Sequence, residues 1–189
     1  MKKYYKQSLA DKVGKYLFWF IWLGLVVFGS HTILRTPISS TLNLLERISG
    51  VFVFSLLFIQ IALRKNINPI IYLLIFIHPL FLFAFNYKIF HTLDPFYIYT
   101  QACLLCKNNL ELFYTFGRLG LWFLTIAVFA ANWKKLHFVN YVAFFFVALH
   151  GWFVGSDFHA SPLKFFFWLS ILIIFLTVLS EVRSKNKIA

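Results

Sequence analysis

The sequence contains few charged residues, and most of those are basic. Only 13% of its 189 residues are Asp, Glu, Lys or Arg and only six are acidic, whereas 61% are apolar. Soluble domains contain about 25% charged and roughly 45–50% apolar residues. Together with a mean hydropathy of +0.78, these proportions exclude an ordinary soluble domain. Because apolar runs of nearly membrane-spanning length recur along the whole chain, we expect an integral membrane protein.

Two further absences narrow the possible functions. Two cysteines are too few to form a disulfide framework. The sequence also contains no G-x-G-x-x-G motif, which marks many nicotinamide- and flavin-binding domains. We therefore expect any flavin or nicotinamide chemistry to reside in a separate protein. The net charge of +12 does not predict nucleic-acid binding, because the basic residues lie in short clusters between apolar runs.

The apolar runs predict an all-α, polytopic membrane protein built as a bundle of six transmembrane helices. The expected helices cover residues 16–34, 47–64, 69–90, 113–132, 137–155 and 163–181. They divide the chain into a basic N-terminal segment (1–15), a six-helix domain (16–181) and a short tail (182–189). No A-x-A-like cleavage site follows the first apolar run, so we expect an uncleaved first helix and not a signal peptide.

The basic residues also predict the orientation in the membrane. With the N-terminus inside, 12 of the 18 lysines and arginines fall on the cytoplasmic side and the remaining six on the outer side. Cytoplasmic segments are enriched in Lys and Arg, so both termini are predicted to be cytoplasmic. An even number of helices agrees with this orientation. The expected location is a bacterial inner or plasma membrane.

Four of the six histidines recur at equal intervals on two of the predicted helices. His78 and His91 are 13 residues apart on the third helix, and His137 and His150 are 13 residues apart on the fifth. The third and fifth helices run in the same direction, so the first histidines can face each other, as can the second. An ionisable side chain inside a membrane span is costly, and it is therefore a functional-site hypothesis by default.

This spacing favours b-type haem, in which one imidazole from each of two flanking helices binds the iron. We predict an inner haem held by His78 and His137 and an outer haem held by His91 and His150. At ~1.5 Å per residue the two irons would lie roughly 20 Å apart. If only one haem is bound, His78 and His150 are the strongest individual ligands, because each lies well inside its helix. Alternatively, each histidine is an isolated polar residue of the bundle.

Two histidines and two arginines are secondary candidates. His31 lies at the outer end of the first helix and His159 in the last outer loop, and each is either an interfacial residue or a further haem contact. Arg47 and Arg118 are predicted at the outer ends of the second and fourth helices, where a guanidinium could pair a haem propionate. Snorkelling of the two arginines to the membrane interface explains their positions equally well.

Three stretches of the sequence resemble the ferric-reductase-like transmembrane family. This family includes the haem cores of NADPH oxidases and ferric reductases, and the haem subunit of the bacterial periplasmic methionine-sulfoxide reductase system. The first stretch, LERISGVFVFSLLFIQIALR (45–64), contains an Arg-x-x-Gly pattern at Arg47 and Gly50. The other two are IFIHPLFLFAFNYKIFH (75–91) and NWKKLHFVNYVAFFFVALHGW (132–152).

The resemblance implies that residues 16–181 form a haem domain, with His78 at the position of the family's inner ligand on helix three. The chain would then be the electron-transferring haem subunit of a reductase system. A separate cytoplasmic flavoprotein reductase or membrane quinol would donate electrons, and an extracytoplasmic reductase, ferric iron or oxygen would accept them. The second histidine of helix three often stands at fourteen residues in two-haem members and is absent from some small ones. Binding of one or of two haem b groups therefore remains open.

Cys103 and Cys106 support a competing function that needs no haem. They form a CLLC sequence in the loop after the third helix, which is expected outside the cytoplasm. There they could form a disulfide or exchange thiols, as in a membrane thiol–disulfide oxidoreductase coupled to a quinone. Lys107 stands where a c-type haem motif requires histidine, so that site is excluded. The pair could equally be a small structural bridge or two ordinary apolar cysteines.

Overall fold

The computed structural model describes residues 9–62, 74, 76–81, 109–129 and 138–186. The α-helices in these ranges are α1 (Leu9–Arg35), α2 (Thr41–Ala62), α6 (Asn109–Phe129), α7 (Phe138–Val154) and α8 (Leu163–Asn186). A short 3-10 helix, η2 (Ser156–His159), connects α7 to α8, and a helical turn covers residues 76–81. The described ranges contain no β-strand, so the all-α prediction is confirmed for them.

Four of the described helices are long and apolar enough to cross a membrane. Their candidate spans are Gly14–Arg35, Thr41–Ala62, Glu111–Val128 and Leu163–Ser180. The shorter helix α7, of 17 residues, is also apolar. These five helices coincide with five of the helices expected from the apolar runs. Most of the expected third helix, 69–90, lies outside the described residues.

The helices α1 and α2 begin earlier than their apolar runs. The first begins at Leu9 where the sequence predicted residue 16, and the second begins at Thr41 where the sequence predicted residue 47. At the start of α2, the hydroxyl of Ser40 accepts a hydrogen bond from the backbone N–H of Asn43 at 3.2 Å. Such a cap stabilises a helix end in polar surroundings. Hydropathy therefore located the apolar middle of these helices but missed their polar first turns.

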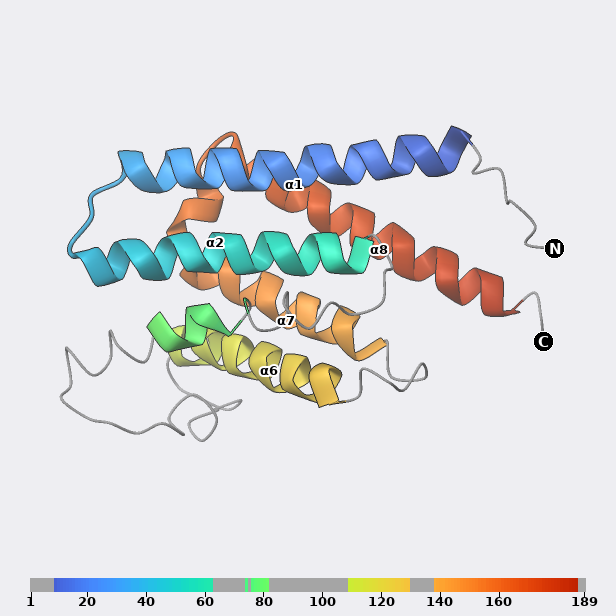
Figure 1. Cartoon of the computed structure of the whole chain (residues 1–189). Helices are drawn as coiled ribbons and strands as arrows, with labels where there is room; N and C mark the ends of the chain where they lie inside the picture. Colours follow the sequence, from blue (N-terminus) through green and yellow to red (C-terminus); the bar gives the residue numbers. More distant parts are fainter. Residues whose placement is uncertain (1–8, 63–73, 75, 82–108, 130–137, 187–189) are drawn as a thin grey trace.

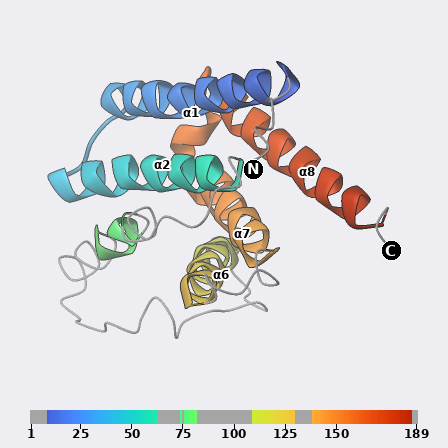
Figure 2. The same ribbon diagram turned by 45° about the vertical axis from the view of Figure 1, so that its right-hand side comes forward.

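The helices form a bundle in which α2 and α8 run in the same direction and α1 and α7 run in the opposite one (Figure 1). Helices α1 and α2 make one antiparallel pair and α6 and α7 make another, while α8 packs against α1 and α2 (Figure 2). The start of α1 and the end of α8 lie on the same side of the bundle. The central element is α2, which contacts α1, α7 and α8, and it is buried at every residue from Val53 to Ala62.

An aromatic cluster joins the helices at the centre of the bundle. The ring of Phe54 on α2 stacks on Phe144 of α7 and on Phe167 of α8, with centroids 5.3 and 5.1 Å apart. It also meets Phe158 of η2 edge-on at 5.3 Å. Aromatic pairs in this distance range stabilise a core beyond the area that they bury. The cluster therefore fixes the position of α7 and η2 against α2.

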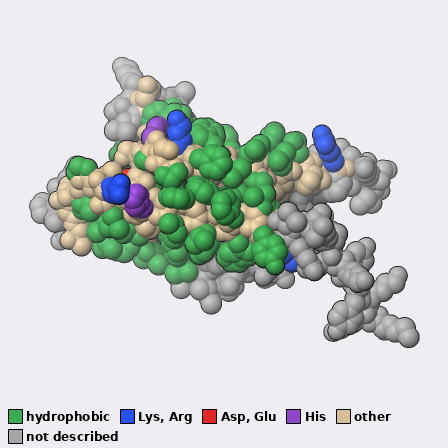
Figure 3. Space-filling model, turned by 90° about the horizontal axis from the view of Figure 1, so that it is seen from above, with side chains coloured by type: hydrophobic (Ala, Val, Ile, Leu, Met, Phe, Trp, Pro, Cys, Tyr) green, Lys and Arg blue, Asp and Glu red, His purple; other side chains and the backbone are tan. Residues whose placement is uncertain are grey.

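The outer surface of the bundle is apolar. Large hydrophobic side chains are exposed along α1 and α8, among them Trp19, Phe20, Leu23, Phe165, Trp168 and Phe175. In Figure 3, hydrophobic side chains cover the middle of the face that includes α1, and Lys, Arg and His atoms lie toward its ends. Soluble monomers rarely expose continuous apolar patches of this kind. The surface thus agrees with the spanning helices and indicates an integral membrane protein.

Candidate functional site

The structure brings His78 and His150 together from two separate segments. His78 lies in the turn at 76–81, which sits beside α2 and α6, and His150 lies one turn before the end of α7. Both side chains are partly buried. The two imidazoles lie near enough to each other for their charges to interact. They are therefore candidates for a shared ligand.

The ring of His78 is anchored to α2 through its Nδ1 atom. The hydroxyl oxygen of Ser49 lies 3.0 Å from Nδ1, and the same hydroxyl donates to the carbonyl oxygen of Glu46 at 2.9 Å. Because the hydroxyl proton is used in that bond, the Nδ1–H of His78 is the donor to Ser49. The Glu46 carbonyl, which can only accept, also interacts with His78. This tautomer leaves the lone pair of Nε2 available to a metal.

The ring of His150 is anchored through the equivalent atom. Its Nδ1 lies 3.0 Å from the backbone carbonyl oxygen of Phe113 on α6. A carbonyl can only accept a hydrogen bond, so Nδ1 bears the proton and Nε2 bears the lone pair. Histidines that bind metals usually donate their other ring N–H to a carbonyl, carboxylate or water in this way. Both imidazoles of the pair thus have the tautomer of a metal ligand.

Two glycines make room for these rings. A Cβ atom added at Gly117 of α6 would lie 2.8 Å from His150 Nδ1, closer than real Cβ contacts occur. One added at Gly50 of α2 would lie 3.3 Å from His78 Cε1, a tight contact that a small shift could relieve. Helix α6 can therefore approach His150 only because residue 117 lacks a side chain. Gly50 belongs to the Arg-x-x-Gly pattern of the sequence, whereas Gly117 was not singled out there.

The two histidines lie at the same end of the bundle. The ring of His78 packs on Gly50, nine residues after the start of α2, and that of His150 packs on Gly117, eight residues after the start of α6. Helices α2 and α6 run in the same direction (Figure 1). The pair is therefore level with the first halves of both helices, at the end of the bundle where α1 gives way to α2.

This arrangement differs from the level-by-level pairing expected from the sequence. That pairing assigned His78 to the inner haem and His150 to the outer one, whereas the structure brings these two residues together. They are also the residues that the sequence favoured for a single haem. The other expected ligands, His91 and His137, lie outside the described residues. The same is true of the cysteine pair, Cys103 and Cys106.

Arg47 is engaged by several partners at the start of α2. Its Nε donates to Asp157 Oδ2 at 2.8 Å, and its Nη2 pairs with Asp157 Oδ1 and with the hydroxyl of Thr36. Its Nη1 donates to the carbonyl of Pro37 at 3.3 Å. Asp157 in η2 is only 6% exposed. This bidentate ion pair ties η2 to α2, a structural role that the sequence did not predict for either residue.

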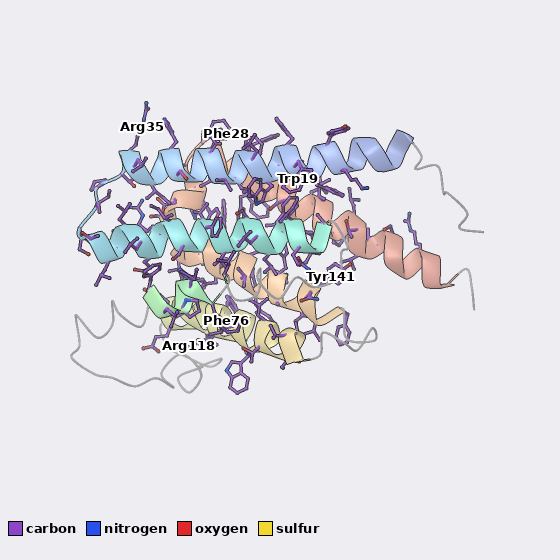
Figure 4. All side chains as sticks on the ribbon, viewed as in Figure 1. Trp19, Phe28, Arg35, Phe76, Arg118 and Tyr141 are labelled. Atoms are coloured by element: carbon purple, nitrogen blue, oxygen red, sulfur yellow. The ribbon has the colours of Figure 1, made fainter. Side chains whose placement is uncertain are left out.

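Arg118 is placed next to the histidine pair. It follows Gly117 on α6, the residue against which the His150 ring packs, and its charge is near enough to interact with that of His150. In Figure 4, Arg118 and Phe76 of the turn at 76–81 lie at the same end of the bundle. A guanidinium beside two metal-binding imidazoles could pair an anionic group of the same ligand.

His31 and His159 are both exposed, on α1 and η2. The Nε2 atom of His159 lies 2.7 Å from the carbonyl oxygen of Trp152, and its ring stacks on the indole at 4.2 Å. Because a carbonyl only accepts, Nε2 is the protonated nitrogen of His159. His159 therefore differs from the two paired histidines, in which Nδ1 is the anchored atom.

Two imidazoles are the axial donor set that a haem requires of a protein. Among the described residues, no group of three or more His, Cys, Asp or Glu side chains is placed to hold a metal. A bare ion would need further protein ligands, whereas a porphyrin supplies four nitrogens and requires only axial ligands from the protein. Two imidazoles with available Nε2 atoms, backed by two glycines, fit that requirement.

The fold and the site together define an α-helical membrane protein with a convergent pair of imidazoles. No protein-family model, curated protein or solved structure matched this chain. The functional conclusion therefore depends on the residues and their geometry.

Proposed function

We propose that this protein transfers electrons across a membrane through b-type haem, as the haem subunit of a reductase system. The observation that supports the proposal is the convergence of His78 and His150, each anchored through Nδ1 with Nε2 available. When bound between them, haem would supply a one-electron carrier. Two protein ligands leave no open position on the iron, which suits electron transfer better than oxygen binding. Under this proposal the chain is a ferric-reductase-like transmembrane protein.

We propose one haem b per chain, with His78 and His150 as its ligands. The other two ligands of the two-haem scheme, His91 and His137, lie outside the described residues. The two-haem scheme requires His78 and His150 at different levels, so their proximity favours a single haem.

Arg118 is the cation best suited to pair a propionate of this haem, because its charge already acts on His150. Arg47 is less suited, since Asp157, Thr36 and Pro37 already engage its guanidinium. In this proposal Arg47 supports the site indirectly. It lies two residues before Ser49, the residue that anchors His78.

We further propose six membrane spans with both termini in the cytoplasm of a bacterial cell. The start of α1 and the end of α8 lie on the same side of the bundle, as an even number of spans requires. The electron donor would be a separate cytoplasmic flavoprotein reductase or membrane quinol. The acceptor would be an extracytoplasmic reductase, ferric iron or oxygen. The histidine pair then lies in the outer half of the bundle, on the side of the acceptor.

The test is a reduced-minus-oxidised absorbance spectrum of the purified protein, with the haem content measured per chain. We expect a low-spin b-type spectrum and one haem per chain. His78→Ala and His150→Ala should each abolish the haem spectrum. The exposed histidines provide matched controls, because His31→Ala and His159→Ala should retain the spectrum. Absence of haem from folded protein made with adequate haem supply would overturn the proposal. Two haems per chain would overturn the single-haem assignment alone.

A cysteine variant separates this proposal from its haem-free competitor. Cys103→Ser should leave the haem spectrum intact. In a thiol–disulfide oxidoreductase, the same variant would abolish activity with a dithiol and a quinone, and His78→Ala would have no effect on that activity.

A further inference from the structure

A groove opens on the surface of the bundle along the first half of α8. It encloses about 480 Å³ and is lined by Ser161, Lys164, Phe165, Trp168, Leu169 and Leu172. Most of these side chains are apolar, and all five of the lining residues on α8 are exposed or partly exposed to the surroundings of the bundle. The volume lies within the ~300–1,000 Å³ range of small-molecule sites in proteins.

The groove has a polar head and an apolar tail. Ser161 and Lys164 lie at the start of α8, and Leu172 lies eight residues after Lys164, roughly 12 Å along the helix at ~1.5 Å per residue. Helix α8 contains the most apolar of the candidate spans, with a mean hydropathy of 2.3. In a membrane, the head of the groove would therefore face the interface, and its tail would face the hydrocarbon.

The charge at the head is held in place by aromatic rings. The ammonium of Lys164 lies 5.9 Å from the centroid of the Trp152 ring, a cation–π contact. The Trp152 ring meets Trp168, which lines the groove, edge-on at 4.9 Å. The lining residues include no carboxylate. The head of the groove thus presents an oriented cation and a hydroxyl to whatever occupies it.

We propose that this groove binds an anionic phospholipid. The phosphate would be held by Lys164 and Ser161, and an acyl chain would lie along Trp168 and Leu172. The apolar walls call for a hydrocarbon chain, and the cation at the interface calls for a negative headgroup. A zwitterionic lipid offers the same chain but no net charge. The proposal is independent of the haem function, because none of the lining residues takes part in the histidine site.

The test compares two lipids on the purified full-length protein by native mass spectrometry. Bound phosphatidylglycerol and phosphatidylcholine are counted after equal additions in detergent. We expect about fivefold preference for phosphatidylglycerol, the factor that corresponds to ~1 kcal/mol for one basic residue near an anionic surface. Lys164→Ala should abolish the preference. The matched control is Lys15→Ala, an exposed lysine near the start of α1, and it should keep the preference.

A second variant tests the groove itself. Leu172→Trp should fill the tail and reduce retention of both lipids, while the haem content stays unchanged. Equal retention of the two lipids by the unaltered protein would overturn the proposal, as would an undiminished preference in Lys164→Ala. Displacement of phosphatidylglycerol by an equimolar neutral quinone would also overturn it, because the groove would then select a ring and not a charge.

Discussion

The two imidazoles of the candidate site are both anchored through Nδ1 but by different kinds of group. His78 lies in a short turn and is anchored by a side chain, the hydroxyl of Ser49. His150 lies in a regular helix and is anchored by the main chain, at the carbonyl of Phe113. The rings also pack differently on their glycines. His150 lies so close to Gly117 that a Cβ atom there would clash, whereas His78 leaves slightly more room at Gly50.

This difference indicates that the two ligands depend on different parts of the fold. The position of His150 follows from the packing of α6 on α7, the most extensive of the described helix pairs. The position of His78 follows from individual side-chain contacts with α2, and α2 is in turn tied to η2 by Arg47. Substitutions of single side chains should therefore loosen His78 more readily, whereas only a steric change in the helix interface should displace His150.

The largest expected effect on stability comes from the ion pair between Arg47 and Asp157, which supports α2, the helix that anchors His78. Asp157→Ala would leave the partly buried guanidinium of Arg47 without its carboxylate and break a bidentate pair, which should destabilise the protein by about 3 kcal/mol. Thermal unfolding in detergent measures the loss. The double variant Arg47→Leu with Asp157→Ala removes both charges and should recover part of it. A double variant less stable than Asp157→Ala alone would contradict a coupled pair.

The next effect contrasts the two glycines. Gly117→Ala would place a methyl group against the ring of His150, and we expect loss of most bound haem together with ~1–3 kcal/mol of stability. Gly50→Ala is the matched control, because its methyl group meets His78 at a distance that a small shift can relieve. Haem content per chain and the unfolding midpoint measure both. Equal losses in the two variants would show that the rings are held alike.

The helices were largely predictable from the sequence, because a membrane span is defined by length and hydropathy. Five of the expected segments correspond to described helices, and the differences concern their polar ends. The beginning of α2 is an example, since the sequence predicted a start at residue 47, whereas the helix and its candidate span both begin at Thr41. The hydroxyl of Ser40 caps this earlier start.

The sequence proposed His78 and His150 as candidate residues but did not pair them with each other. Histidine in an apolar run is a strong signal, so His78 and His150 were both identified. Which histidine lies opposite another depends on how far each helix is shifted along its neighbours. The equal 13-residue spacing in the sequence does not determine that shift. Asp157 was missed because its partner Arg47 lies 110 residues away in the sequence. Gly117 could have been noticed in the sequence, because it is a glycine inside an apolar helix and directly precedes Arg118.

The smallest effect tests the side-chain anchor of His78 directly. Ser49→Ala removes the hydroxyl acceptor that faces Nδ1 and so weakens the hydrogen bonding of that nitrogen. When the ring nitrogen that does not bind the iron, Nδ1, donates a hydrogen bond, the imidazole becomes a more basic ligand. A more basic ligand stabilises ferric iron. Loss of this hydrogen bond should raise the haem midpoint potential. A net hydrogen bond of ~1 kcal/mol corresponds to roughly 40 mV for one electron.

The control for this prediction comes from the other histidine. Phe113→Ala keeps the backbone carbonyl that anchors His150, so the potential should change little, although a ring is lost from the interface of α6 and α7. Ser49→Thr retains the hydroxyl and should restore most of the original value. Redox titration of the absorbance spectrum measures all three variants. A potential that moves with Phe113 and not with Ser49 would mean that packing around His150, and not the hydroxyl at His78, sets the properties of the site.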